Sequence, residues 1–210
     1  MPRLMDMGLD QLNSLLLDMA NLSQQAVAAS IDAYSRGAKG NEVRQMSNRL
    51  RSLHRQVSDL AMEMIARYQP VASDLRFLKA CMEISYGFFR YGRYALDIAS
   101  VLDMFGDLGK CDKKFVVDTA KKTQEMIRMS VEAFARRDVE MARNIPKMDD
   151  VVDESYRSNL RQTVERKGGD IKCALSATLI LRYLERIADH ASYIGESVEY
   201  IATGIEPKPD

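Results

Sequence analysis

Two pairs of carboxylates stand one helical turn apart in the second half of the sequence. Asp149 and Asp153 form one pair, and Glu185 and Asp189 form the other. Side chains four residues apart lie on the same face of a helix, so each pair could offer oxygen ligands to one cation. If the two helices pack antiparallel, the four acids would meet and repel one another unless a cation lay between them. Oxygen ligands without cysteine favour a hard ion such as Mg²⁺ or Mn²⁺; iron would also fit, whereas zinc is less favoured.

The same spacing also fits an ordinary solvent-exposed helix face. Glu185 and Asp189 fall on one polar stripe with Arg182, well round the helix from its aliphatic side chains. Arg182 and Glu185 are then expected to form an i,i+3 ion pair of small energetic value. On spacing alone, the metal-site and the solvated-face interpretations both stay open.

A carboxylate-bridged metalloenzyme or metal-storage bundle is a less favoured interpretation. Such proteins direct Glu-x-x-His motifs into the core of a helical bundle. The only histidines are His54 and His190, and neither lies three residues after a glutamate. We therefore expect a protein that is not an enzyme.

The elements that must position these acids are helices. Proline and glycine are scarce and grouped, and between them apolar residues recur with a period of 3.6 and no sustained alternation. An all-α fold follows, with helices expected over 4–36, 41–68, 74–105, 112–137, 139–167 and 170–202.

The two halves of the sequence resemble each other. The segment 25–34 aligns with 125–134, and the third expected helix aligns with the last one at about the same offset. An internal duplication of a three-helix unit explains both registers. We therefore expect two tandem three-helix bundles, packed end to end or side by side, in residues 1–106 and 107–210.

Charge, hydropathy and cysteine content exclude several classes of protein. Thirty basic and thirty acidic side chains give a formal net charge of zero, so no global field attracts nucleic acid or a membrane. The longest apolar stretch is too short to span a bilayer, and the first residues lack a signal-peptide pattern. We expect a cytoplasmic protein without nucleic-acid partners or membrane insertion.

Cys81, Cys111 and Cys173 form no CxxC pair, and each is expected to pack separately as a small apolar side chain.

Two motifs of this sequence resemble the signatures of a known family. They are Gln-Pro-Val-Ala-Ser-Asp-Leu-Arg-Phe-Leu at 69–78 and Arg-Tyr-Leu-Glu-Arg-Ile-Ala-Asp-His-Ala at 182–191. Both are similar to motifs of the PhoU family of phosphate uptake regulators, and the similarity covers nearly the whole chain. The resemblance implies two three-helix bundles with multinuclear metal sites built from E(D)xxxD motifs, one site per repeat. It also implies a homodimer that acts as a negative regulator linking a phosphate ABC transporter to a sensor histidine kinase.

The first repeat departs from the family pattern, whereas the second keeps both acidic motifs. Where acids are expected, the first repeat has Ser47 and Arg51 on one helix and Phe89 and Arg93 on the next. Two cations and two neutral groups in place of four acids would exclude a metal ion, so we expect metal in the second half only. Arg51, Arg90 and Arg93 are either ordinary surface arginines or a patch that binds phosphate, a phosphorylated partner or an acidic surface.

The altered first repeat leaves a second functional interpretation open. The chain could keep the PhoU fold and serve as a scaffold or chaperone-like adaptor for another transporter or kinase.

Overall fold

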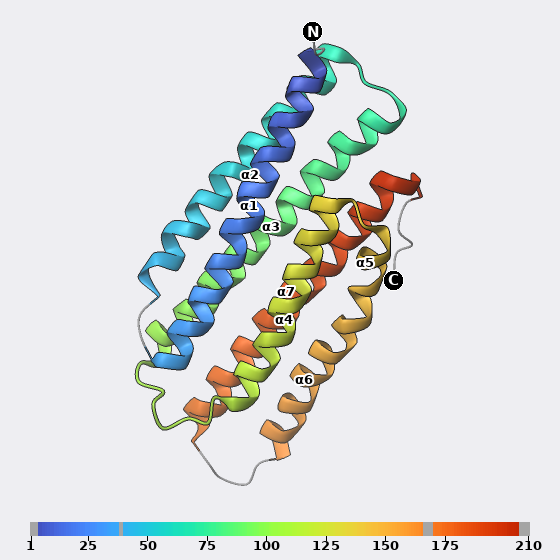
Figure 1. Ribbon diagram of the computed structural model, residues 1–210. Helices are drawn as coiled ribbons and strands as arrows, with labels where there is room; N and C mark the ends of the chain where they lie inside the picture. The colour runs from blue at the N-terminus through green and yellow to red at the C-terminus, as the bar shows by residue number, and fades with distance from the viewer. Residues whose placement is uncertain (1–3, 38–39, 166–169, 206–210) are drawn as a thin grey trace.

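The protein is all-helical in the computed structural model, which describes residues 4–37, 40–165 and 170–205 (Figure 1). The elements are α1 (Leu4–Arg36), α2 (Asn41–Tyr68), α3 (Ala72–Phe105), α4 (Lys114–Arg136), α5 (Val139–Asn144), α6 (Pro146–Glu165) and α7 (Ile171–Thr203). Six of these helices are long and α5 is a single short segment, so the expected all-α class is confirmed. The expected end of the fifth helix at residue 167 lies outside the described residues.

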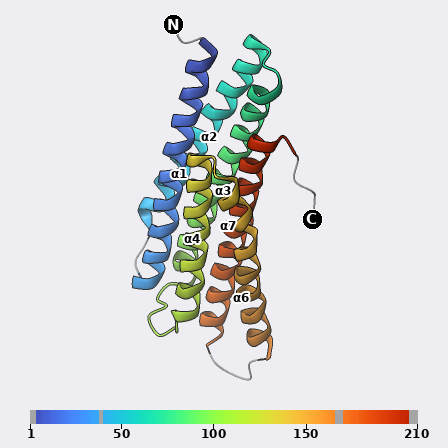
Figure 2. The ribbon, with the colours of Figure 1, turned by 45° about the vertical axis from the view of Figure 1, so that its right-hand side comes forward.

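The helices form two bundles that lie side by side (Figures 1 and 2). In the first bundle α1, α2 and α3 pack against one another, and in the second α4, α5 and α6 pack with α7. The bundles meet along α3 and α7 and, on one side, along α1 and α4. The order α2, α3, α7, α6 therefore makes one layer, and α1 and α4 cover only one of its sides. We call the other side of this layer the open side.

The two central helices run antiparallel and approach closely. The ring of Tyr94 in α3 stacks on that of Tyr183 in α7, with centroids 6.3 Å apart. A Cβ on Gly87 would lie only 2.8 Å from Cδ1 of Ile194, so this crossing needs a residue without a side chain in α3. The small residue brings the two halves into one continuous apolar core.

The expected helix over 139–167 is broken, which corrects the sequence-based boundary. Helix α5 ends at Asn144, and Pro146 takes the first position of α6, where a missing backbone N–H costs nothing. α5 packs directly on α7: a Cβ on Gly195 would lie 2.9 Å from the carbonyl oxygen of Ala142. The break places Asp149 in the first turn of α6, where the helix dipole favours an anion.

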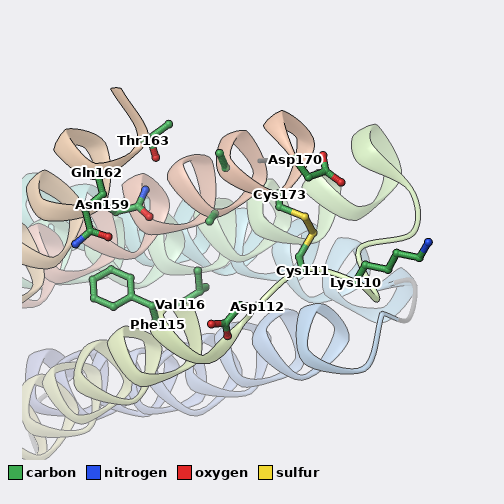
Figure 3. Close-up of a pocket in the computed structure, with 12 residues that line it drawn as sticks. Lys110, Cys111, Asp112, Phe115, Val116, Asn159, Gln162, Thr163, Asp170 and Cys173 are labelled. Atoms are coloured by element: carbon green, nitrogen blue, oxygen red, sulfur yellow. A yellow bond between two sulfur atoms is a disulfide. The ribbon is translucent and has the colours of Figure 1, made fainter. Parts of the chain in front are cut away.

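The expectation that all three cysteines pack separately is wrong for two of them. Cys111 and Cys173 form a disulfide across 62 residues, with their Cα atoms 5.3 Å apart (Figure 3). The α3–α4 connection passes the first turn of α7, and no local spacing in the sequence signals this approach. The disulfide borders a cavity of about 440 Å³ that is lined by polar and apolar side chains alike. Cys81 is buried with a free thiol, as expected.

Candidate metal centre

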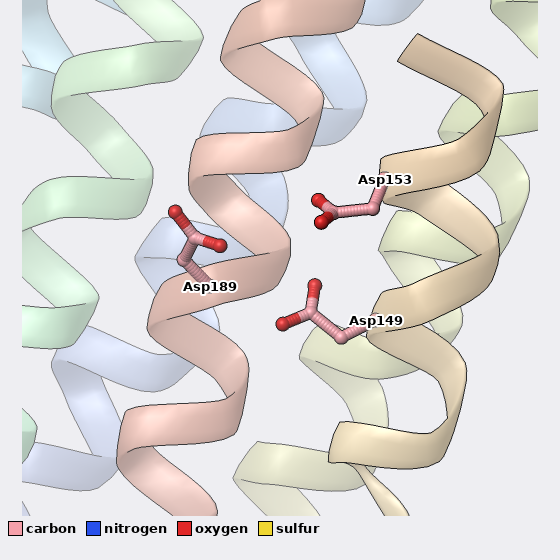
Figure 4. Close-up of side chains that lie close together, drawn as sticks. All are labelled: Asp149, Asp153 and Asp189. Carbon is pink, nitrogen blue, oxygen red and sulfur yellow. The ribbon is translucent and has the colours of Figure 1, made fainter. Parts of the chain in front are cut away.

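Three aspartates from two helices lie close together on the open side (Figure 4). Asp149 and Asp153 extend from α6 toward α7, and Asp189 lies on α7 with one carboxylate oxygen turned toward them. One carboxylate oxygen of each lies within 4.8 Å of the others, and all three side chains are partly buried. The structure thus places three of the four acids singled out in the sequence close enough to share one ion.

Each α6 aspartate has one oxygen engaged and one oxygen free. Asp153 Oδ2 accepts a hydrogen bond from Arg157 Nη2 at 3.0 Å, and Asp149 Oδ2 accepts one from Ser192 Oγ at 3.3 Å. The Oδ1 atoms of Asp149 and Asp153 are buried and have no hydrogen-bond partner. A buried acceptor without a donor carries an uncompensated desolvation cost, which a cation would remove. The donor set therefore fits a hard metal ion.

Glu185 lies beside the cluster but is held by arginines. Its Oε1 accepts a hydrogen bond from Arg182, which confirms the expected i,i+3 pair, and Arg186 Nε lies 3.8 Å from its Oε2. Glu185 is only 9% exposed, so the solvated-face interpretation is wrong for this residue. The physical reason is that α6 covers this face of α7. A helical wheel of α7 alone does not contain that information.

Burial and crowding raise the pKa of Asp149, Glu185 and Asp189. The pKa of Asp149 rises to about 7, first because of burial and then because of the charges on Asp189 and Asp153. Burial also raises the pKa of Glu185 and Asp189, against the opposing charge of Arg186. Negative charge is therefore costly here without a cation, and a bound metal ion would favour the ionised form of each acid.

The corresponding surface of the first half has no such cluster. Ser47 is buried, and Phe89 stacks on His54 with ring centroids 5.6 Å apart. Arg93 Nη2 lies 3.2 Å from Asp97 Oδ1 within α3. Throughout the described ranges, only the α6–α7 aspartates form a group of three or more Asp, Glu, His or Cys side chains placed to share an ion.

The three arginines proposed as an anion patch have different surroundings. Arg90 lies over the ring of Tyr94, 4.6 Å from its centroid, and donates a hydrogen bond to its hydroxyl. Arg93 is paired with Asp97, whereas Arg51 is exposed and pairs with nothing in the part of the chain that is described. Two of the three are thus engaged within α3, and anion binding by this set stays a prediction.

Sequence reasoning missed three side chains that contact the acids. Arg157 follows Asp153 by four residues and Arg186 precedes Asp189 by three, so helical spacing could have found both. Ser192 in α7 donates a hydrogen bond to Asp149 in the neighbouring helix α6, and nothing local in the sequence indicates that contact.

The PhoU domain matches this chain twice, over residues 16–102 and 116–198. The chain belongs to the PhoU family. The first PhoU match falls within α1–α3 and the second within α4–α7, so the duplication expected from the sequence is confirmed.

Several known PhoU proteins are similar to this chain over most of its length. A phosphate-specific transport system accessory protein PhoU homolog from Pseudomonas aeruginosa is 31% identical over 207 residues, which cover 94% of this chain and 85% of that protein. A homolog of the same name from Pseudomonas putida is 29% identical, over 94% of this chain and 80% of that one. These names describe an accessory protein of a transport system and no enzymatic activity.

Two solved PhoU structures share the fold. The crystal structure of PhoU from Pseudomonas aeruginosa superposes with a TM-score of 0.88 at 29% identity, over 95% of this chain and 99% of that one. PhoU from Streptococcus pneumoniae gives a TM-score of 0.89 over 98% and 100% of the two chains. At 19% identity, that second likeness shows the fold alone.

Proposed function

We propose that this PhoU-family chain is a negative regulator of phosphate uptake and phosphate signalling. The observation that carries the proposal is the double PhoU match together with relatives named as accessory proteins of a phosphate-specific transport system. The partners would be components of a phosphate ABC transporter, a sensor histidine kinase, or both. The open side, where the acids lie, is the surface we assign to partner binding.

In this proposal the acids hold a structural metal ion rather than a reactive one. Asp149, Asp153 and Asp189 would be the ligands, with Glu185 beside them, and the ion would supply a positive charge that joins α6 to α7. Arg157 and Arg186 hold the second oxygens of Asp153 and Asp189 and so fix the direction of the free ones. Iron, Mn²⁺ or Mg²⁺ suits such oxygen ligands better than zinc does.

The proposal also includes a cytoplasmic homodimer that does not bind nucleic acid or insert into the bilayer. None of the described helices is long and apolar enough to cross a membrane. A reducing cytoplasm would keep Cys111 and Cys173 as thiols, so the fold is expected to persist without their bond.

A PhoU-fold scaffold or adaptor for another transporter or kinase is the second candidate. The observation that favours it is the changed first-half surface, where Ser47, Arg51, Phe89 and Arg93 replace the expected acids. A partner that recognises two metal-bearing surfaces would find only one here.

Deleting the gene and measuring uptake of labelled phosphate in phosphate-rich medium tests the regulator. Loss of the chain is expected to raise uptake, and the wild-type gene should restore the low rate. The Asp149→Asn, Asp189→Asn double variant should fail to restore it, whereas the exposed pair Asp150→Asn, Glu154→Gln should succeed. An uptake rate unchanged by the deletion would contradict the regulator proposal, and a change in another transported solute would favour the adaptor.

A further inference from the structure

The outer side of α2 carries a row of unpaired arginines. Arg44, Arg51 and Arg55 fall within about 40° of one another around the helix and extend along about 16 Å of it. We call these three residues the arginine face. All three are exposed, and none forms an ion pair or hydrogen bond with a described residue. Arg49 is exposed too but lies about 140° round the helix from Arg44.

No other helix covers this face. α2 lies at one edge of the helical layer and packs only against α1 and α3, so its outer side meets no other helix. The acid nearest to the face is Asp59, one turn beyond Arg55; it forms no ion pair with the three arginines, and the stretch 43–58 contains no Asp or Glu. The positive charge of the arginine face is therefore presented to whatever lies outside the protein.

The described arginines of the second half, unlike those of the arginine face, all have interaction partners. Each described arginine there forms an ion pair or lies over an aromatic ring: Arg128, Arg136, Arg137, Arg143, Arg157, Arg161, Arg182 and Arg186. The helix at the opposite edge of the layer, α6, carries four acids and no base between residues 148 and 156 (Figure 1). A chain of zero net charge is thus polarised, with α2 as its basic edge and α6 as its acidic edge.

We infer that the arginine face docks on an anionic phospholipid surface. Guanidinium groups bind phosphate oxygens with two parallel hydrogen bonds, and a lipid headgroup layer offers such oxygens repeatedly over a plane. The three side chains stand in a row about 16 Å long on one side of the helix, which suits a plane better than a single small anion. Met62 lies on the same side of α2 and is 57% exposed, so the face also offers an apolar side chain to the interface.

An acidic protein surface is the weaker alternative. Such a partner would have to place carboxylates at fixed positions opposite three long, unrestrained arginines, whereas mobile lipids can arrange themselves around them. Docking through α2 also directs the acidic α6 edge away from the bilayer, which avoids repulsion between its exposed acids, Asp150 and Glu154, and the lipid phosphates. The molecule would then lie with its long axis parallel to the membrane and its metal-binding acids away from the lipid.

The interaction should be weak, reversible and dependent on salt. Each arginine close to an anionic leaflet raises binding by about fivefold, so three together contribute about a hundredfold. At about 1 M salt the Debye length is about 3 Å, and most of this attraction should disappear. The inference does not depend on phosphate regulation, because it concerns the charge of α2 alone.

Co-sedimentation with lipid vesicles tests the inference. One set of vesicles is pure phosphatidylcholine, and the other contains one part phosphatidylglycerol to two parts phosphatidylcholine. The wild-type chain should sediment only with the anionic set at low ionic strength. The variant Arg44→Gln, Arg51→Gln, Arg55→Gln should lose about a hundredfold in apparent affinity. The matched variant Lys114→Gln, Lys121→Gln, Lys122→Gln removes three exposed charges from α4 and should bind like the wild type.

Three results would overturn the inference. The first is absence of wild-type binding to anionic vesicles at low ionic strength. The second is equal loss of binding in the α2 and α4 variants, which would show that net charge and not the arginine face decides binding. The third is tighter binding to soluble poly-glutamate than to the vesicles, which would assign the face to an acidic protein. Circular dichroism of both variants should show the helical content of the wild type, so that a loss of binding is not caused by a folding defect.

Discussion

Asp149 is the acid whose ionisation costs most in the metal-free site. Its pKa in the fold, about 7, stands above the ordinary value of 3.8, because of burial and then the charges of Asp189 and Asp153. This penalty on stability is absent below about pH 4, grows as the pH rises, and is complete above about pH 7. A metal ion would remove the penalty by pairing with the carboxylate.

Replacing Asp149 by Asn should therefore stabilise the metal-free protein in a pH-dependent way. After chelation, the variant should gain more free energy of unfolding at about pH 8 than at about pH 5, because only ionised Asp149 is penalised in full. Urea denaturation at both pH values measures the gain. The exposed Asp150→Asn change is the control and should show little effect at either pH. An equal gain for Asp149→Asn at both values would contradict the raised pKa.

At the residue scale, the sequence predicts partners within a helix better than partners between helices. The Arg182–Glu185 contact follows from i,i+3 spacing alone. The burial of Glu185 and the contact from Ser192 to Asp149 depend on how α6 packs on α7. The sequence of either helix alone does not contain that geometry.

The junction between α5 and α7 depends on a single glycine. A Cβ at Gly195 would lie 2.9 Å from the backbone oxygen of Ala142, which cannot move without displacing α5. Gly195→Ala should therefore lower the free energy of unfolding by about 1–3 kcal/mol, measured by urea denaturation.

Gly8→Ala in α1 is the matched control for this junction. Its Cβ would meet the Cε and Sδ atoms of Met64 at 2.7 and 2.8 Å, and these atoms end a flexible side chain that can turn, unlike a backbone oxygen. Alanine also has the higher helix propensity, so the control should be neutral or slightly stabilising. If both variants lost the same stability, the close approach of α5 to α7 would not be the cause.

The disulfide should stabilise the start of α7. Closing a loop between Cys111 and Cys173, which are 62 positions apart in the sequence, is expected to contribute about 4 kcal/mol through the unfolded state. Reduction should therefore lower the Tm by roughly 10 °C for a chain of this size. Thermal denaturation with and without dithiothreitol measures the shift. The Cys111→Ser, Cys173→Ser variant should have the lower Tm with or without dithiothreitol. An equal Tm for the oxidised and the reduced wild type would contradict this prediction.

At the element scale, apolar periodicity predicts the long helices well. The ends of α1 and α2 coincide with the ranges expected from the sequence, because glycine and proline stop those helices locally. The break at Ile145 and the disulfide were not predicted. Pro146 is compatible with either a kinked helix or a new one, and packing of α5 on α7 decides between them.

For the whole molecule, the duplication predicts two bundles but leaves their arrangement open. The structure places them side by side, because α3 and α7 carry small residues such as Gly87 where they cross. This arrangement also puts α2 and α6 at opposite edges of the layer. The electrical polarity of the molecule therefore follows from the fold and is invisible in a net charge of zero.

Elemental analysis of the purified chain tests most directly that the α6–α7 acids hold a metal ion. The wild type, purified without chelators, should retain metal, and the Asp149→Ala, Asp189→Ala variant should lose it. The control Asp150→Ala, Glu154→Ala removes two exposed acids from α6 and should keep the metal. All three proteins should show the same helical circular dichroism. Metal content unchanged in the Asp149→Ala, Asp189→Ala variant would contradict the account, because the acids would then form only a polar surface.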